Sequence, residues 1–351
     1  MAGALTASAR TTVRDVTIDV ARGIAILLVV LGHNSALAGA APGFVDALFL
    51  FHVPLFFLLS GLVQPSHPMN VAVTRLARGL LLPLLVAAVS VGALKLMTRG
   101  GSVEHLLAGI AWATGQTLPW SHLWFLPALF LTLLTTQALR NLPGGAARWA
   151  FASAAALLAV LSVPMAVGPD LSTLGFAAPV GLPWNLDLLP ACLLFVCAGA
   201  LLHDAPALRA RVEHPLVVAT AVLLFAFSLG ARVDFNLRVF TPPPLAVLAA
   251  ASGCVVALAL ARVLTTLPKV AALLATVGRH TLTIFLLHVS IQKALLGLIA
   301  VPTSTFMRAL TGLATAAVAV LASLAVSAAW KWVLSRWRPR RMTAHAREVA
   351  T

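Results

Sequence analysis

Long apolar stretches recur along the whole chain, and they constrain its fold more than any other feature. Several run for about 18 residues or more with few charges, the length that an α-helix needs to cross a bilayer. Hydrophobic residues make up 60% of the 351 residues and charged residues only 10%, with a mean hydropathy of +0.99. This composition excludes a soluble globular domain and predicts an all-α polytopic membrane protein.

About ten stretches fit a transmembrane helix. We predict spans at about 17–38, 44–64, 76–98, 122–139, 149–168, 184–202, 213–231, 242–263, 280–300 and 307–334. The shorter and more polar stretch 104–118 is expected to lie at the membrane interface. The chain then divides into an N-terminal tail at 1–16, one membrane domain at 17–334 and a basic C-terminal tail at 335–351.

The distribution of Lys and Arg predicts the orientation, because cytoplasmic flanks of membrane helices are enriched in these residues. With the N-terminus in the cytoplasm, two of the 24 Lys and Arg residues lie inside spans, Arg22 and Lys293, and 17 lie on inner flanks. The five on outer flanks are Lys95, Arg99, Arg232, Arg238 and Arg308. Both termini are therefore predicted to be cytoplasmic. The net charge of +14 reflects this topology, and no connection is long enough to form a basic domain that binds nucleic acid.

The first predicted span contains two ionisable residues, Arg22 and His33. Such residues are costly inside a bilayer, normally face a protein interior or a wet cavity, and mark a functional site. Eleven helical residues make about three turns plus 20°, so the two side chains share one stripe about 16 Å apart. Asp19 lies one turn before Arg22 on nearly the same side, where the two can pair.

Two further segments place polar residues at the ends of the next spans. FHVPLFFLLSG, residues 51–61, contains His52 and a proline that bends the helix. The sequence leaves two roles open for this segment, helix packing and catalysis. TRLARG places Arg75 and Arg78 one turn apart at the cytoplasmic start of the third span. Two guanidiniums on one face near a helix N-terminus can bind phosphate.

The remaining polar segments lie in the middle and near the end of the chain. SHLWFLPALF brings His122 and Trp124 to the outer end of the fourth span, where a Trp ordinarily belongs to the aromatic belt. GRHTLTIFLLHVSIQK contains His288. A buried, hydrogen-bonded histidine and one that lines a cavity remain equal alternatives for His288.

Together these segments resemble the acyltransferase 3 family, especially its fucose-4-O-acetylase-like branch, from about residue 14 to about residue 335. The matching pieces are Arg22 with His33, FHVPLFFLLSG, Arg75 with Arg78, HLWFLPALF and TLTIFLLHVSI. The resemblance implies about ten transmembrane helices and O-acylation: an acyl group, often acetyl, moves from a cytoplasmic coenzyme A thioester to a hydroxyl, usually on a sugar.

The resemblance also implies roles for single residues. His33 matches the essential histidine of the family and Arg22 the arginine of the same motif, with Asp19 as a third candidate. Arg75 and Arg78 match the pair implicated in holding acyl-CoA. The residues expected to bind the acceptor or to line the cavity are Asn34, His52, His122, Trp124 and His288.

A neutral imidazole can take a proton from an attacking hydroxyl and return it to the thiolate leaving group, so His33 is the expected general base. A covalent acyl-histidine intermediate is the alternative mechanism. A different class is a small-molecule or glycan transporter or flippase whose intramembrane His and Arg coordinate substrate.

The expected partners are acyl-CoA (acetyl-CoA as donor), a carbohydrate, glycan or glycosylated small-molecule acceptor, and the lipid bilayer, here the plasma membrane of a bacterium. No metal is expected, because the histidines and carboxylates lack a ligand spacing such as H-x-x-x-H. The acceptor and the length of the acyl chain stay open.

Overall fold

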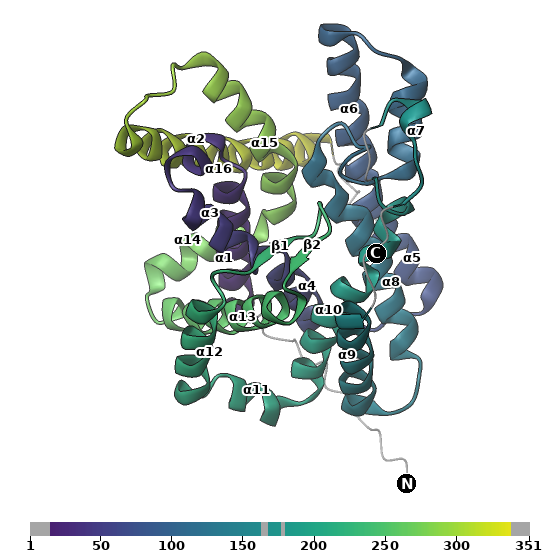
Figure 1. Ribbon diagram of the computed structural model, residues 1–351, viewed down its shortest axis with the longest axis vertical. Coiled ribbons are helices and arrows are strands. Elements are labelled where there is room, and N and C mark those ends of the chain that lie inside the picture. The colour runs from purple at the N-terminus through teal and green to yellow at the C-terminus, as the bar shows by residue number, and fades with distance from the viewer. Residues whose placement is uncertain (1–14, 163–167, 177–179, 338–351) are drawn as a thin grey trace, which may run out of the picture.

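The computed structural model describes residues 15–162, 168–176 and 180–337. Within these ranges the protein is almost entirely helical, with a single two-stranded antiparallel hairpin (Figure 1). The tails predicted at 1–16 and 335–351 lie almost wholly outside the described residues. The all-α prediction is confirmed.

The first part of the chain alternates long helices with short helical turns. It contains α1 (Val16–Gly32), α2 (Ser35–Ala40), α3 (Pro42–Phe49), α4 (His52–Val63), α5 (Met69–Leu76), the π-helical turn η1 (Ala77–Leu81), α6 (Leu82–Arg99), α7 (Val103–Trp112), the 3-10 turn η2 (Ser121–Trp124) and α8 (Phe125–Arg140).

The second part adds the hairpin between two helices. It contains α9 (Gly145–Ser162), the 3-10 turns η3 (Ser172–Leu174) and η4 (Pro183–Leu188), α10 (Leu189–Asp204), α11 (Pro206–Val212), α12 (Pro215–Phe227), β1 (Arg232–Asp234), β2 (Val239–Thr241), α13 (Pro243–Thr265), α14 (Pro268–Arg279), α15 (Thr281–Leu298) and α16 (Thr305–Trp337).

Proline opens many of these helices, because its missing N–H belongs to the unpaired first turn and its fixed φ suits a helix start. It is the first residue of α3, α11, α12, α13 and α14. Polar caps open others: the Asp15 carboxylate accepts from the Thr17 N–H at the start of α1. The Ser102 hydroxyl accepts from the His105 N–H at the start of α7.

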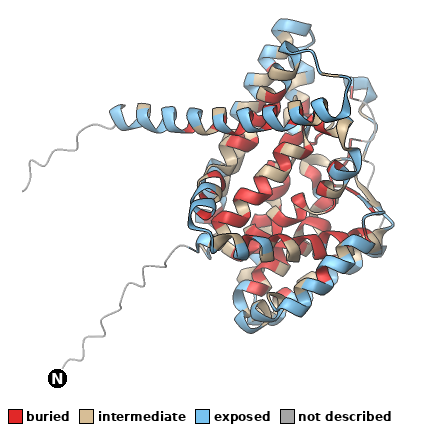
Figure 2. Cartoon of the chain, turned by 90° about the vertical axis from the view of Figure 1, so that its left-hand side faces the viewer, coloured by how far each residue is buried: buried red, intermediate tan, exposed pale blue. Residues whose placement is uncertain are grey.

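Eight helices in the described ranges are long and apolar enough to cross a membrane, or nine if the bent pair α11 and α12 forms one span. With 17 residues, α1 lies at the lower limit of a spanning helix, and counting it gives the ten predicted spans. Figure 2 shows the buried residues at the centre and exposed ones around the rim. Exposed apolar residues such as Phe151, Leu223 and Phe227 fit contact with lipid.

Two predicted spans are broken in the structure. The span expected at 17–38 ends at Gly32, because the Asn34 side chain caps a new helix by accepting from the Leu37 N–H at 3.0 Å. The span expected at 44–64 is broken at Leu50 and Phe51, between α3 and α4. His33 therefore directly follows α1, and His52 opens α4.

Polar contacts gather the helix ends that the sequence predicts to be cytoplasmic. Asp15, before α1, pairs with Arg209 of α11 at 3.2 Å. Asp19 lies 3.9 Å from Arg279 at the end of α14, and Lys331 of α16 lies 2.7 Å from the Nε2 atom of His280. We call this the inner end, and the end that carries the β1–β2 hairpin the outer end.

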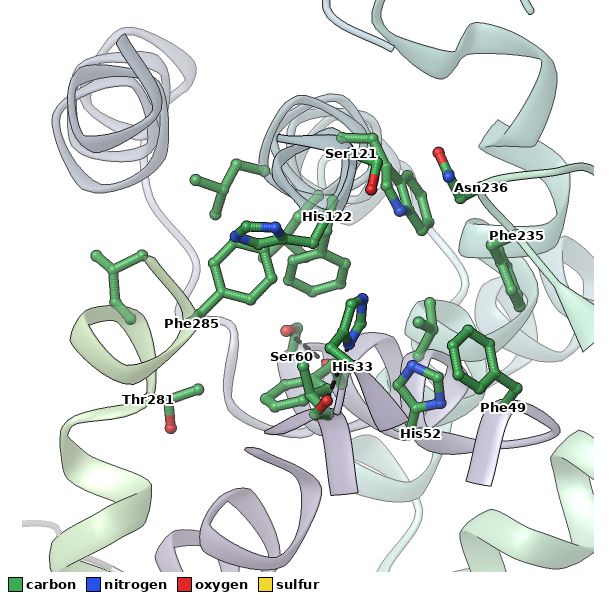
Figure 3. A pocket seen from close by; sticks show the side chains of 18 of the residues that line it. His33, Phe49, His52, Ser60, Ser121, His122, Phe235, Asn236, Thr281 and Phe285 are labelled. Atoms are coloured by element: carbon green, nitrogen blue, oxygen red, sulfur yellow. Dashed lines mark hydrogen bonds between the residues drawn. The ribbon is translucent and has the colours of Figure 1, made fainter. Parts of the chain in front are cut away.

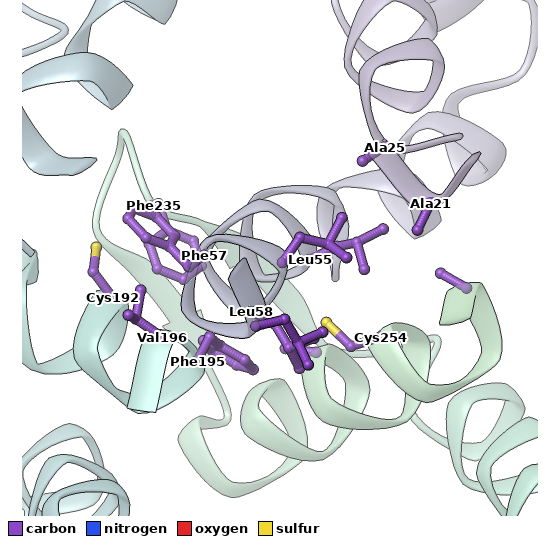
Figure 4. Packing of buried hydrophobic residues seen from close by; sticks show 14 of the residues in the cluster. Ala21, Ala25, Leu55, Phe57, Leu58, Cys192, Phe195, Val196, Phe235 and Cys254 are labelled. Atoms are coloured by element: carbon purple, nitrogen blue, oxygen red, sulfur yellow. The ribbon is translucent and has the colours of Figure 1, made fainter. Parts of the chain in front are cut away.

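Glycines let two pairs of helices pack at backbone distance. A Cβ atom on Gly61 of α4 would overlap the Val196 carbonyl oxygen of α10, and one on Gly199 of α10 would overlap the Leu58 carbonyl oxygen. Around this contact, Phe57 and Leu58 pack with residues of α10 and α13 in the largest buried apolar cluster (Figure 4). Such close approach is typical of membrane helices, which associate through packing.

The second close pair joins α1 to α14. A Cβ atom on Gly23 would overlap the Leu274 carbonyl oxygen, and one on Gly278 would overlap the Asp19 carbonyl oxygen. These contacts fix α1, and with it the position of His33, against α14.

Candidate active site

A cavity of about 480 Å³ runs through the centre of the molecule. At the inner end it is lined by Arg22, Arg279 and Thr281, and at the outer end by the hairpin residues Asp234 and Asn236. The histidines that line it are His33, His52 and His122. Figure 3 shows His33 between His52 and His122, with Thr281 and Asn236 on opposite sides of the view. The cavity therefore extends from the charged inner end to the outer hairpin.

The break after α1 fixes the orientation of the His33 ring. Its Nδ1 atom lies 2.9 Å from the carbonyl oxygen of Val29, which can only accept a hydrogen bond. Nδ1 therefore carries the proton and donates, so a neutral ring has its lone pair on Nε2. That nitrogen is the one a general base needs.

Four histidine rings cluster at this depth. The ring centroid of His33 lies 6.5 Å from that of His52, 6.0 Å from that of His122 and 5.4 Å from that of His288. In the part of the chain that the structure describes, no group of three or more His, Cys, Asp or Glu has the geometry of a metal site. The cluster offers nitrogen atoms for hydrogen bonds instead.

Two of these rings keep a buried nitrogen without a hydrogen-bond partner, the Nε2 atoms of His122 and His288. The His288 Nδ1 atom lies 3.0 and 2.8 Å from the carbonyl oxygens of Ile284 and Phe285, so Nε2 of the neutral ring is an acceptor. His288 is fully buried behind the cavity wall and does not line the cavity. Its ring nevertheless packs 5.1 Å from that of His122, which does.

The structure separates the predicted cations into two sets. Arg22 lines the cavity, and Arg279 joins it there. Arg75 and Arg78 are exposed and do not line it, although Leu80, in the same π-helical turn as Arg78, does. The Arg75 guanidinium lies 3.0 Å from the Nε2 atom of His67.

The β1–β2 hairpin closes the outer end. Burial raises the pKa of the Asp234 carboxyl, although this group accepts a hydrogen bond from the Leu237 N–H at 2.9 Å. The hairpin is anchored by Arg238, whose guanidinium donates to the Asp187 carboxylate at 2.7 Å with both side chains almost fully buried. A charged pair this well satisfied holds the hairpin in place, and removing either partner would strand a buried charge.

Two further predicted site residues, Trp124 and Asn34, make contacts that support the fold. Trp124 lines the cavity and stacks on Phe235, with ring centroids 6.3 Å apart and an interplanar angle of 13°. Asn34 does not line the cavity: its amide donates to the Gly312 carbonyl and the Thr315 hydroxyl, each at 3.0 Å. Its cavity role is therefore not supported, because its amide nitrogen joins the start of α2 to α16 and its carbonyl oxygen caps α2.

Sequence reasoning missed several polar residues of the cavity wall, among them Arg279, Asp234 and Asn236. Arg279 directly precedes His280 in the polar segment GRHTLTIFLLHVSIQK, which contains the predicted residue His288. Asp234 is one of only 10 acidic residues in the chain and lies on a predicted outer connection. A scarce carboxylate beside the membrane is itself a signal for function.

Comparison with known proteins gives two matches. The sequence model of the acyltransferase 3 family, described as an acyltransferase domain, matches residues 15–332. The nodulation protein NolL of Sinorhizobium fredii (strain NBRC 101917 / NGR234) is 28% identical over 171 residues, which cover 44% of this chain and 44% of NolL. The match thus spans less than half the length of this curated relative. No solved structure shows significant similarity to the chain.

Proposed function

The chain belongs to the acyltransferase 3 family, and on this premise we propose that it transfers an acyl group, acetyl in the simplest case, from acyl-CoA to a carbohydrate or glycosylated hydroxyl. The protein is a multi-pass membrane acyltransferase. We place it in the plasma membrane of a bacterium, in keeping with the bacterial source of NolL. This assignment favours the enzyme over the transporter.

The observation that carries the proposal is the position of His33 inside one cavity that reaches both the inner arginines and the outer hairpin. An acyl donor and an acceptor that enter from opposite ends can meet at this ring. Bringing both reactants into reach of the base accounts for much of the rate enhancement of a transferase.

The inner end suits the donor. Coenzyme A carries several phosphate charges that cannot enter hydrocarbon, so they stop at the membrane surface while the thin pantetheine arm threads inward. In this proposal Arg75 and Arg78 hold the phosphates at the exposed rim, and Arg22 and Arg279 line the way inward. Guanidinium groups bind phosphate through paired, charge-assisted hydrogen bonds.

At the centre, Nε2 of His33 accepts the proton of the acceptor hydroxyl, and the hydroxyl oxygen attacks the thioester carbonyl carbon. The carbon–sulfur bond breaks, and the imidazolium returns the proton to the coenzyme A thiolate. The products are an ester and free coenzyme A. In the alternative mechanism Nε2 attacks the thioester carbonyl carbon first, the carbon–sulfur bond breaks, and coenzyme A leaves as the thiolate, which gives an acyl-imidazole. The acceptor hydroxyl oxygen then attacks the acyl carbon, the nitrogen–carbon bond breaks, and the hydroxyl proton passes to the thiolate.

Asp19 supports the motif indirectly. It is 3% exposed, does not line the cavity and lies beside Arg279. We assign it to positioning the inner arginines rather than to contact with substrate.

The test uses membranes of a strain from which the gene has been deleted, supplied with the wild-type protein, His33→Ala or His203→Ala. His203 is exposed at the end of α10 and is a matched control. Labelled acetyl-CoA should transfer label to glycan material with the wild type and His203→Ala but not with His33→Ala. Full transfer by His33→Ala would refute the role of this histidine, and no transfer by the wild type would refute the donor.

A further inference from the structure

A second cavity, of about 610 Å³, lies beside α6 and α7. Its polar wall contains Lys95, Arg99, Ser102, His105, Gln116 and Thr117. The Gln116 amide donates to the Asn236 carbonyl oxygen in the hairpin at 3.1 Å, which places the cavity at the outer end. This cavity is separate from the central one and contains none of its histidines.

Two cations, Lys95 and Arg99, line this cavity, and a third, Lys293, lies beside it. Lys95 and Arg99 lie one turn apart on α6, and the ammonium groups of Lys95 and Lys293 lie 4.6 and 4.0 Å from the centroid of the same Trp120 ring. Among the described residues, no carboxylate oxygen lies within 4.0 Å of any of the three. They form a concentrated positive site without an internal counter-charge.

Such a cluster is unexpected at the outer end. Outer flanks of membrane helices are depleted of Lys and Arg, and like charges one turn apart on a helix repel each other. The indole N–H of Trp120 is also buried without an acceptor. Lys95 and Arg99 line the hollow, while Lys293 and the Trp120 N–H lie next to Lys95 outside its lining. One proton of the Lys95 ammonium is donated to the Pro119 carbonyl oxygen, so the remaining donors are groups that an oxyanion ligand would satisfy.

The second cavity shares a wall with the central cavity. Trp120 is followed directly by Ser121 and His122, which line the central cavity, and Gln116 contacts Asn236, which lines it as well. Figure 3 shows Ser121 and Asn236 on the same side of the central cavity. The walls of the two cavities are therefore neighbours, both along the chain at Trp120–His122 and across the Gln116–Asn236 contact.

We propose that the second cavity binds a phosphate or diphosphate group carried by the acyl acceptor, while the acceptor hydroxyl reaches His33. A diphosphate has at least two negative charges to match Lys95 and Arg99, whereas a single carboxylate would leave one of them unmatched. Leu96, Leu106 and Leu118 also line the cavity, so the group can carry an apolar tail. The link to the acceptor rests on the proposed function; the anion site itself does not.

The test measures binding of farnesyl diphosphate to the purified full-length protein in a phosphate-free detergent. The site variant is Lys95→Gln/Arg99→Gln, and the control is Arg232→Gln/Lys269→Gln, which removes two exposed cations elsewhere. We expect the site variant to weaken binding about tenfold or more, as loss of charge-assisted hydrogen bonds does, and the control to stay within about twofold. Thermal melting checks that each variant is folded. If the double variant does not fold, Arg99→Gln alone replaces it and should still weaken binding.

Phosphatidylglycerol as competitor separates the two sources of phosphate. The proposal predicts that it displaces farnesyl diphosphate only in large excess, and equal displacement would assign the site to a bilayer lipid and overturn the link to the acceptor. Absence of binding, or equal binding by site and control variants, would overturn the site. Because no acyl donor is present and His33→Ala should bind normally, the result is independent of whether the acyl transfer itself is established.

Discussion

The span that contains His52 differs sharply in packing from the span of α5, η1 and α6, which holds basic residues predicted to lie on both sides of the membrane. In the span Pro42–Val63, which contains α3 and α4, 67% of the most apolar stretch is buried, against 17% in the span Met69–Arg99. The first region is closely packed through glycines, and the second is mainly exposed. In the proposed function, chemistry is therefore placed on the more buried helices, and charge recognition on the exposed α5–α6 arm.

This contrast predicts that changes in the two regions have different kinetic effects. Substitutions on the more buried helices should lower kcat or the stability of the fold. Substitutions on the α5–α6 arm should raise the KM of one substrate and leave kcat almost unchanged.

The largest expected effect is that of His33→Ala. Removing a general base costs roughly 100- to 10,000-fold in rate, so kcat should fall by about 1,000-fold while the melting temperature changes little. Steady-state kinetics with labelled acetyl-CoA measures this fall. A fall equal to that of His203→Ala would show that the ring has no special role.

The next effect concerns stability. Gly61→Ala would place a methyl group on the Val196 carbonyl oxygen, and overpacking of this kind costs about 1–3 kcal/mol or more. Gly297→Ala in α15 is the matched control, because a Cβ atom there meets nothing within 4 Å. Thermal melting should separate the two by several degrees, and equal melting temperatures would contradict the close packing.

A smaller effect is expected on the arm. Arg75→Gln/Arg78→Gln should raise the KM for acetyl-CoA about tenfold, through lost phosphate contacts worth about 1.4 kcal/mol, with kcat within about threefold. Arg211→Gln/Lys269→Gln removes the same charge from exposed positions on other inner-end helices. If both double variants changed the KM equally, the arm would act only through net charge.

The smallest effect concerns pH and Asp234. Because burial raises its pKa in the folded protein, the folded state binds this proton more tightly than the unfolded chain, and stability falls as the pH rises above the ordinary carboxyl pKa. Asp234→Asn should therefore be more stable than the wild type at neutral pH, and the difference should vanish in acid. Melting curves across pH measure it, and a difference that grows in acid would contradict the raised pKa.

Much of the fold could be predicted from the sequence, because spans of about 20 apolar residues are set by the bilayer itself. The breaks at Asn34 and at Leu50–Phe51 could not be predicted from hydropathy: the first depends on a side-chain cap, and the second leaves no mark in an apolar run. These breaks leave His33 and His52 at helix ends beside the cavity.

Five of the predicted site residues line the cavity: Arg22, His33, His52, His122 and Trp124. Arg22 and His33 are related by helical periodicity, and both line the cavity. Arg279 and Asp234 come to the same cavity from distant segments, through packing of α14 on α1 and through the anchored hairpin. A single sequence contains no information on those distances, so the carboxylate at the outer end was not predicted.

The most direct test of the central claim, that donor and acceptor meet at His33 from opposite sides of the membrane, uses sealed inside-out vesicles. Labelled acetyl-CoA is added outside, against the cytoplasmic face, and the native acceptors stay enclosed. The account predicts that labelled acceptor accumulates inside and is accessible to an impermeant reagent only after lysis, with no label in His33→Ala vesicles. Labelling confined to acceptors on the same side as the acetyl-CoA would contradict it.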